Sequence, residues 1–519
     1  MRLATDSLDL AREHLAAQSD TDLFPRPFEI EAISSRWRAL CRQPLAGDMR
    51  QWRCSASRRC LVPKHRYGFR VATQLDPLDC LVLTAVIAEF GADIEAMRVP
   101  VDDQVCFSHR FSPDRAGRLY NTAFTYQTFL DAVRHRLEDR RYTYVVVTDI
   151  ADFYPRLYLH PLENALRATG RTDHAAVVIR MIKQLNANVS YGVPVGPRAV
   201  HLLAEAALDA VDRSLLAERV EFCRYVDDYV VFARGRREAY VALALLAGSL
   251  FEIHGLTLQP HKTKIRATED YLQEMNRFET GPVGTMVGEL RRILRRYGVD
   301  YDPYERIDYQ ALPLEARQEI ERLNLPARLR DALGAEDIDV NLAGFLLQRL
   351  TQLGRPDLAE EVMGNAERLY PVFSEAVRYL TEVTREPTAA RRLRDWLLAA
   401  LTDEVVSHLD FHRLWILRAL AWNDERMPGA ETLTDLYAQY ADEFSRRELL
   451  LALGRRREHA WFFARRRSWQ GLGAWERRAF LYGASCMPRD QYAHWCRSQN
   501  ATMTPLERAV SEWASDSPI

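Results

Sequence analysis

Two adjacent carboxylates in Tyr225-Val226-Asp227-Asp228 are the residues of this chain with the clearest chemical use. They lie between two apolar β-type runs, 220–223 and 229–232, so we expect them at the tip of a hairpin. Like charges this close repel each other unless a cation lies between them. A third acid, Asp149, ends a β-branched run 78 residues before Asp227. Three acids on two neighbouring strands predict a two-metal nucleotidyl-transfer site, in which metals about 3.5–4 Å apart clamp the attacking and leaving oxygens.

The elements that must position these acids alternate between strand and helix over 140–270. We expect a strand over 144–149, a helix over 197–216, the hairpin, a helix over 237–254 and a last strand that begins at 256. This order is the βαββαβ unit of a ferredoxin-like palm.

The pattern of predicted secondary structure changes after about residue 275. A turn-rich joint is expected at 281–284, and from 312 to 519 the pattern is wholly helical with short polar breaks. Helices in antiparallel pairs suggest an α-solenoid or an irregular helical repeat, although no strict repeat period is present.

The bulk composition excludes several classes of protein. With 519 residues, 47% of them apolar, the chain is long enough for several globular domains. No run of ~18 uncharged apolar residues occurs, so we expect no membrane span. We expect no signal peptide, since residues 1–6 carry an acid and no apolar run. The spacing of Cys54, Cys60 and His65 fits no zinc pattern, so we predict free thiols in the cytoplasm.

Four segments in order carry a resemblance to a known family. Asp149-Ile150-Ala151-Asp152-Phe153-Tyr154-Pro155, Gly192-Val193-Pro194-Val195-Gly196-Pro197, Tyr225-Val226-Asp227-Asp228 and Gly255-Leu256-Thr257-Leu258-Gln259-Pro260-His261-Lys262-Thr263 resemble motifs A, B, C and D of reverse transcriptases. Each lies on the secondary structure that the family motif requires. The resemblance implies an α+β reverse transcriptase fingers and palm, followed here by an all-α helical-repeat domain.

Further segments resemble the abortive-infection (Abi) branch of bacterial reverse transcriptases, within the defence-associated group. They include 21–29, 74–79 and, in the helical half, 480–484 with His494-Trp495, which is similar to the HEAT-like domain of that branch. The predicted boundaries are a helical arm at 1–60, fingers and palm at 61–275, a joint at 276–311 and HEAT-like helices at 312–519. The resemblance implies a role in phage defence, a homo-oligomer, and DNA synthesis from dNTPs that needs no template and starts on a protein hydroxyl, so that the DNA stays attached to the protein.

Departures from the family pattern occur in motif B and after motif D. Many reverse transcriptases have Gln, Ser and Asn where this chain has Val195, Val200 and Glu205, and no thumb is evident. Both departures argue against ordinary templated copying. Two alternatives stay open: a templated polymerase that uses a small RNA partner, and an inactive palm that serves as a scaffold for RNA or a phage protein.

The predicted metal ligands are Asp149, Asp227, Asp228 and the carbonyl of Ile150. Asp228 either completes the metal shell or only shapes the hairpin. Mg²⁺ is the default metal because oxygen ligands and phosphates suit it, with Mn²⁺ as an alternative. Lys262 matches the motif D lysine that protonates the leaving pyrophosphate; a solvated lysine at a strand edge is the alternative.

The predicted nucleotide contacts come from motifs A and B and from a basic segment. Tyr154 matches the steric gate that excludes a ribose 2′-OH, or it is an ordinary core aromatic. The others are Phe153, Pro194, Gly196, Lys64 and Arg70. Arginine binds phosphate oxygens bidentately, so we also expect Arg66, Arg291 and Arg295 to contact nucleic acid; solvated surface positions are the alternative for these basic residues.

Overall fold

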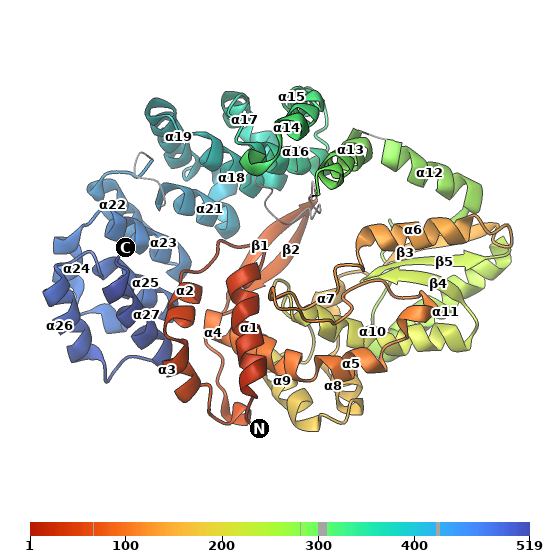
Figure 1. Ribbon diagram of the computed structural model, residues 1–519, viewed down its shortest axis with the longest axis horizontal. Coiled ribbons are helices and arrows are strands. Elements are labelled where there is room, and N and C mark those ends of the chain that lie inside the picture. Colours follow the sequence, from red (N-terminus) through yellow and green to blue (C-terminus); the bar gives the residue numbers. More distant parts are fainter. Residues whose placement is uncertain (66, 281, 299–308, 422–425) are drawn as a thin grey trace. The chain divides into compact units, whose positions relative to one another are not determined.

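The computed structural model describes residues 1–519 except 66, 281, 299–308 and 422–425 (Figure 1). The chain divides into two compact units, 1–58 with 72–276 and 59–71 with 277–519. We describe each unit by itself.

The first unit contains a four-stranded antiparallel sheet with the strand order β4-β5-β3-β6. The strands are β3 (Tyr144–Asp149), β4 (Glu221–Tyr225), β5 (Asp228–Ala233) and β6 (Lys264–Ala267). In chain order this places the first strand between the third and the fourth, which is the order of a ferredoxin-like βαββαβ unit. The predicted palm topology is therefore the one observed.

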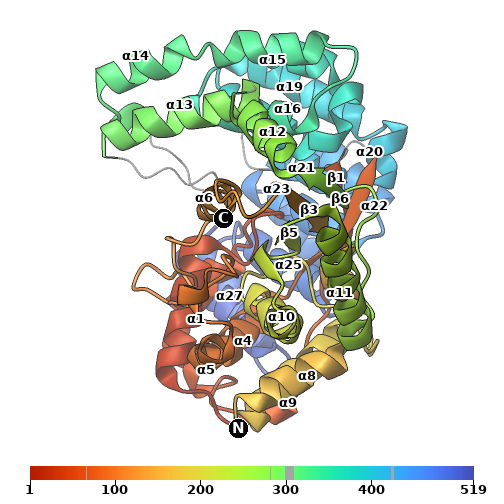
Figure 2. The ribbon, with the colours of Figure 1, turned by 90° about the vertical axis from the view of Figure 1, so that its right-hand side faces the viewer.

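Helices cover both faces of this sheet (Figures 1 and 2). On one face, α6 (Tyr126–Leu137) packs on β4 and β5, and a buried cluster contains Phe129, Val145 and Phe232. On the other face, α11 (Arg236–His254) packs on β3 and β5, and α10 (Val200–Ala217) packs on α11. Period-2 alternation in β3 and β5 sends successive side chains into the two layers.

The first unit contains further helices, several of which pack on α10 or on one another. They are α1 (Thr5–Gln18), α2 (Glu29–Ser35), α3 (Trp37–Arg42), α4 (Pro77–Glu89), α5 (Gly91–Met97), α7 (Phe153–Arg156), α8 (Leu159–Ala168) and α9 (Thr172–Leu185). Three-residue 3₁₀ turns occur at Met49–Gln51 and Val101–Asp103. The N-terminal arm is anchored because α1 packs on α4.

The last strand of the sheet begins later than the sequence suggests. We predicted a strand from 256, whereas β6 starts at Lys264, and before it only Leu258 forms an isolated antiparallel bridge, with Ile150. Pro260 has no N–H to donate, so continuous pairing is interrupted there.

The described part of the second unit is helical apart from a hairpin. β1 (Arg58–His65) pairs with β2 (Gly68–Gln74), and the outer ends of both strands belong to the first unit. Of the turn predicted at 281–284, residue 281 lies outside the described residues, and a helix begins at Pro282, since proline is accepted at the first helical position. The described elements are α12 (Thr268–Thr280), which begins in the first unit, and α13 (Pro282–Arg296), α14 (Leu314–Arg322), α15 (Leu325–Gly334), α16 (Val340–Leu353), α17 (Ala359–Gly364), α18 (Phe373–Val383), α19 (Pro387–Ala400), α20 (Glu404–His408), α21 (Asp410–Ala421), α22 (Ala430–Gln439), α23 (Glu443–Arg455), α24 (His459–Arg465), α25 (Ala474–Ala484), α26 (Arg489–Gln499) and α27 (Pro505–Asp516), with 3₁₀ segments at Tyr309–Ala311, Ala366–Val372 and Trp469–Gly471.

These helices follow one another in a serial stack. α16 packs on α18, and α21, α23, α25 and α27 each pack on the one before. The predicted all-helical character of the C-terminal half is confirmed for the described residues.

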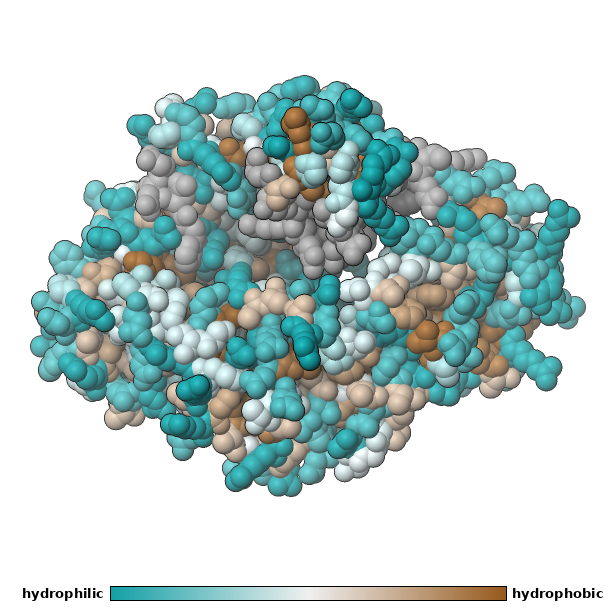
Figure 3. Space-filling model, in the orientation of Figure 1, coloured by the Kyte–Doolittle hydropathy of each residue, from teal (hydrophilic) through white to brown (hydrophobic). Residues whose placement is uncertain are grey.

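The surface is mainly hydrophilic on the face that Figure 3 shows, with scattered hydrophobic side chains. Within the described part of the chain, no helix combines the length and the apolar character that a membrane span requires.

Gly196 occupies a backbone position that a larger residue cannot share. Its φ is +142°, and a Cβ built there would lie 2.5 Å from the carbonyl oxygen of Thr73. Gly248, in the middle of α11, has nothing within 4 Å of a built Cβ.

We therefore expect opposite effects from two Gly→Ala substitutions. Gly196→Ala should lower the free energy of unfolding by about 1–3 kcal/mol, because of the left-handed backbone and the clash. Gly248→Ala should raise it by about 0.5–1 kcal/mol, because alanine favours the helix. Urea denaturation of both variants measures this, and a stable Gly196→Ala protein would show that the turn can relax.

Candidate active site

The three predicted acids lie together where the two central strands of the sheet, β3 and β5, have their neighbouring ends. β3 ends at Asp149, β5 begins at Asp228, and the two residues are directly opposed in the antiparallel register. Asp227 lies beside them in the two-residue turn that joins Tyr225 to Asp228. The backbone N–H of Ile150 donates to the carbonyl of Asp227 at 3.1 Å, which ties the turn to the end of β3. The prediction that these acids share one hairpin and its neighbouring strand is confirmed in its geometry.

The turn contains a β-branched residue in a backbone conformation that such residues avoid. Val226 has φ of +54°, in the left-handed region. Two side chains bind its peptide groups: the Val226 N–H donates to Oγ of Ser108 at 2.9 Å, and Arg224 Nη1 donates to the Val226 carbonyl at 3.0 Å. Strain of this kind persists only where the surroundings impose it, and it is concentrated at functional sites.

Arg224 is itself held by two buried acids. Its guanidinium donates to both carboxylate oxygens of Asp212, at 2.9 and 2.5 Å, and to Glu205 at 3.0 Å. The side chains of Arg224, Glu205 and Asp212 are each only 1% exposed. A buried guanidinium with so many partners has one available orientation, so its contact with Val226 is fixed.

Glu205 joins this network to the segment before α6. It accepts from Arg98 Nη2 at 2.8 Å and from Ser108 Oγ at 2.5 Å. Burial alone would raise the pKa of Glu205, but the guanidinium groups of Arg224 and Arg98 outweigh it and hold that pKa well below the usual range. Glu205 is therefore a buried carboxylate, committed to ion pairs.

Sequence reasoning missed Arg224, Ser108 and Arg98 as parts of the site. A signal existed for Arg224, because an arginine at the end of an apolar strand run, three residues before Asp227, must find partners if that strand is buried. Nothing local marks Ser108. It reaches the turn because residues beside it pair with β4, where the Phe107 N–H donates to the Arg224 carbonyl at 3.0 Å.

Lys262, the residue that matches the motif D lysine, contacts Asp149, and its predicted role as a proton donor stays a prediction. Its Nζ lies 2.8 Å from Oδ2 of Asp149. Partial burial lowers the pKa of Lys262, but the hydrogen bond and charge of Asp149, with those of Asp228 and Asp227, outweigh it and leave that pKa above its ordinary value. Lys262 is thus an ammonium at neutral pH, positioned beside the acids.

Tyr154, on α7, lies beside the acids, and its side chain contacts α10. Its hydroxyl is 2.6 Å from Nδ1 of His201, and its ring meets the His201 ring edge-on. Burial raises the pKa of Tyr154 well above its usual range, and the charges of Glu205 and Asp227 act in the same direction. Phe153 is buried, 5.2 Å from the Tyr154 ring between centroids. This placement is compatible with the predicted steric gate.

The motif B loop is tied to the same region by backbone hydrogen bonds. The Val193 N–H donates to the carbonyl of Tyr154 at 2.9 Å, and the Thr73 N–H donates to the carbonyl of Val195 at 2.7 Å. Pro194 is buried between these two anchors. Pro194 thus directly follows the residue that bonds to Tyr154, whereas Gly196 lies against the Thr73 backbone.

The predicted basic contacts all belong to the second unit. Lys64 is exposed on β1, whereas Arg70 on β2 is partly buried; both belong to the second unit, and the acids belong to the first. Arg295 is exposed on α13. Arg66 and the side chain of Arg291 lie outside the described residues. Roles for these five residues stay predictions.

The acids suit a divalent cation in their chemistry. Among the described residues, no three His, Cys, Asp or Glu side chains converge as they stand on one ion position. Carboxylate oxygens are nevertheless the ligands that Mg²⁺ prefers. In this structure the Lys262 ammonium is paired with Asp149, and the charges of Asp227 and Asp228 also raise its pKa. The acids therefore already attract a positive charge from the protein itself. The donor set therefore fits Mg²⁺.

Comparisons with known proteins agree with this geometry. Residues 62–283 match the family described as Reverse transcriptase (RNA-dependent DNA polymerase). No curated protein matches the chain.

Two solved structures are similar over most of the chain. One is telomerase from Candida albicans in complex with TWJ fragment of telomeric RNA, at 11% identity and a TM-score of 0.32, covering 78% of this chain and 70% of that chain. The other is apo telomerase from Candida tropicalis, at 10% identity and a TM-score of 0.33, covering 74% and 72%. At these scores neither structure contributes to the functional assignment.

The buried network predicts a large effect of a small substitution. Glu205→Gln should lower the free energy of unfolding by about 3–5 kcal/mol, because Arg224 and Arg98 lose a charged partner inside the protein. Glu163→Gln is the matched control: its pair with Arg167 is exposed, and the loss should stay below about 1 kcal/mol. Chemical denaturation at neutral pH measures both, and equal small losses would contradict the network.

The same comparison has a defined pH dependence. Since the pKa of Glu205 is depressed in the folded state, its stabilising effect is present above the unfolded pKa and is lost as the pH falls through the folded pKa. The difference between wild type and Glu205→Gln should therefore shrink below about pH 4.

Proposed function

Because residues 62–283 form a reverse transcriptase domain, and the chain is therefore a nucleotidyltransferase of the RNA-directed DNA polymerase type, we propose that it synthesises DNA from dNTPs at Asp149, Asp227 and Asp228. The observation that carries this proposal is the direct opposition of Asp149 and Asp228 across β3 and β5, with Asp227 in the adjoining turn. The reaction is in-line attack of a hydroxyl on the α-phosphate of a dNTP, with pyrophosphate as the leaving group.

The chain's own residues have distinct parts in this reaction. Asp149, Asp227, Asp228 and the Ile150 carbonyl would hold Mg²⁺, with Mn²⁺ as a substitute. When bound there, Mg²⁺ would supply charge neutralisation at the phosphates and activation of the attacking hydroxyl. Lys262, an ammonium beside Asp149, can donate a proton to the leaving pyrophosphate. Tyr154 orients the sugar and excludes a 2′-OH, with its ring braced by Phe153 and its hydroxyl by His201.

We further propose that synthesis needs no template. In many reverse transcriptases, motif B supplies polar groups to the templating base. Here the corresponding side chains are either apolar or already bonded to other groups of the protein. Glu205 is enclosed by Arg98, Arg224 and Ser108, and Val200 is fully buried in α10. These positions therefore have no side-chain hydrogen bond to offer a base.

The wider role that we propose is antiphage defence of the Abi type. It rests on the sequence resemblance and on the serial stack from α16 to α27, which is compatible with a HEAT-like repeat. In this proposal the enzyme is a cytoplasmic homo-oligomer that starts DNA synthesis on one of its own hydroxyl groups. Free thiols at Cys80, Cys106 and Cys223 suit a reducing compartment.

A templated polymerase with an RNA partner is the second candidate. The matched family is described as RNA-dependent, and this description favours copying of RNA. An inactive scaffold is a third, and the three adjacent acids with a positioned lysine argue against it.

The first test is incorporation without added nucleic acid. Nuclease-treated full-length protein is incubated with Mg²⁺ and labelled dNTPs, and products are separated on a denaturing gel with and without protease. We expect a product that shifts with protease and falls by at least ~10³-fold in Asp227→Asn, because loss of a metal ligand removes several kcal/mol of transition-state stabilisation. Asp152→Asn is the matched control, since Asp152 is an exposed acid of the same motif and should retain activity.

Each other outcome changes the assignment. Product only after addition of a template–primer or RNA would favour the templated polymerase. No product in any condition, with Asp227→Asn indistinguishable from wild type, would contradict the polymerase proposal and favour the scaffold.

Tyr154 provides a test of substrate choice. Tyr154→Ala should reduce discrimination against rNTPs by about 10- to 100-fold, because the sugar pocket loses its bulky wall. Tyr154→Phe keeps the ring and loses only the hydrogen bond to His201, so it should keep the discrimination and lose about 1 kcal/mol of stability. Competition assays with paired dNTP and rNTP measure the ratio, and unchanged selectivity in Tyr154→Ala would reject the gate.

A further inference from the structure

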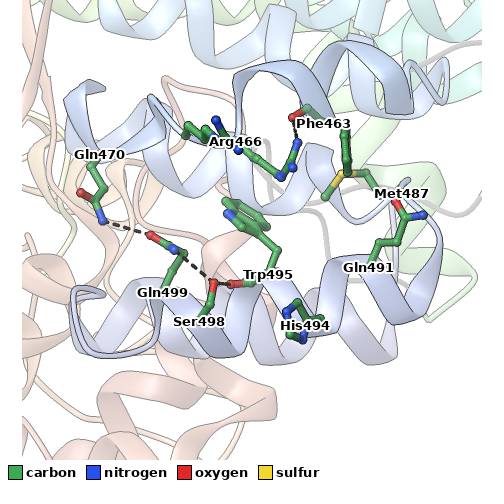
Figure 4. Close-up of a pocket in the computed structure, with 10 residues that line it drawn as sticks. Phe463, Arg466, Gln470, Met487, Gln491, His494, Trp495, Ser498 and Gln499 are labelled. Carbon is green, nitrogen blue, oxygen red and sulfur yellow. Dashed lines mark hydrogen bonds between the residues drawn. The ribbon is translucent and has the colours of Figure 1, made fainter.

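A cavity of about 490 Å³ opens on the C-terminal helices, far along the chain from the acids. Its walls come from α24, from α26 and from the segment between α24 and α25 (Figure 4). Its volume lies within the range of ordinary small-ligand sites, about 300–1,000 Å³.

The chain around this cavity is strongly cationic. Between 459 and 499 there are seven arginines and two acids, although the whole chain has a net charge of −2. Arg466, Arg467 and His494 line the cavity, and none of the described residues that line it is an Asp or a Glu. A cavity with cations on its wall and no acid is suited to an anionic ligand.

Arg466 and Arg467 are neighbours in the sequence but differ in the contacts that their side chains make. The Arg466 guanidinium carbon lies 3.4 Å from the centroid of the Phe463 ring, and Nη1 donates to the Phe463 carbonyl, so this side chain is fixed in place. Arg467 is exposed, and among the described residues its guanidinium has no hydrogen bond or ion pair. One arginine is thus pre-oriented, and the next has its donors available.

The opposite side of the cavity offers ordered polar groups. Ser498 Oγ donates to the Trp495 carbonyl at 2.7 Å, and Gln499 Nε2 donates to Ser498 Oγ at 3.1 Å (Figure 4). Trp495 is buried and packs edge-on against Trp469, which makes this wall rigid. A rigid wall with fixed hydroxyl and amide groups reduces the entropy that a ligand must lose on binding.

We propose that this cavity binds a nucleotide through its phosphate, on a free nucleotide or within a single strand. Arg466 and Arg467 present guanidinium groups, which match phosphate oxygens, and His494 adds two ring nitrogens. Phe463 is 44% exposed; the Arg466 guanidinium covers one face of its ring, which leaves the opposite face for a base to stack on. This site goes beyond the proposed synthesis, because binding here requires none of the three acids.

The test uses full-length Asp227→Asn protein, so that binding is separated from catalysis. A 3′-fluorescein dT8 probe is titrated, and anisotropy gives the dissociation constant at several salt concentrations. Arg467→Gln should weaken binding several-fold and reduce the salt slope by about 1, as expected for loss of one phosphate contact. Arg466→Gln with Arg467→Gln should weaken binding further.

Arg497→Gln is the matched control, because Arg497 is an exposed arginine of α26 that does not line the cavity. It should bind as the parent protein does. If the double variant fails to fold, the single Arg467→Gln protein decides, since Arg467 is exposed. Dilution of the probe into wild-type protein shows whether loss of Asp227 matters for binding.

Competition distinguishes the sources of the phosphate. Displacement by dTMP identifies a free nucleotide, whereas displacement by unlabelled dT8 alone identifies a strand. Equal affinity in Arg467→Gln, the double variant and the parent would overturn the proposal. Displacement by poly-glutamate and by neither nucleotide ligand would also overturn it, in favour of an acidic protein segment.

Discussion

The buried guanidinium of Arg224 is the constraint on which the candidate site depends. It is bonded to Asp212 and Glu205 inside the first unit and donates to the Val226 carbonyl. A buried ion pair of this kind contributes little net stability, since desolvation offsets the attraction between the charges. Its consequence here is geometric: Val226 is kept in a left-handed conformation, and that conformation sets where Asp227 lies.

The palm topology does the rest of the positioning. A strand order of β4-β5-β3-β6 places β3 between the hairpin and the last strand, so that the end of β3 meets the hairpin turn on one side. The segment before β6 lies on the other side, where the Gln259 N–H donates to the Asp149 carbonyl at 2.7 Å. Lys262 follows three residues later and contacts the Asp149 carboxylate. Elements far apart in the sequence thereby bring three acids and one ammonium to the same edge.

Much of this site could be predicted because its signals are local. The β-type runs and the acids beside them indicate Asp149, Asp227 and Asp228. Gly255, which follows the helix expected over 237–254, indicates where the segment that contains Lys262 begins. The support of the site is not local. Ser108 has no sequence signal, because its role depends on pairing between its neighbours and β4. Glu205 reads as a departure from the motif, and only the structure shows that it is the counter-charge of Arg224 and Arg98.

The most direct test of the central claim is an experimental structure of the protein with Mg²⁺ and a non-hydrolysable dNTP. The account predicts a cation bound by Asp149 and Asp227, the Lys262 ammonium moved from Asp149 towards the triphosphate, and Val226 still bonded to Ser108 and Arg224. A nucleotide bound elsewhere, with Lys262 still paired to Asp149 and no cation at the acids, would contradict it.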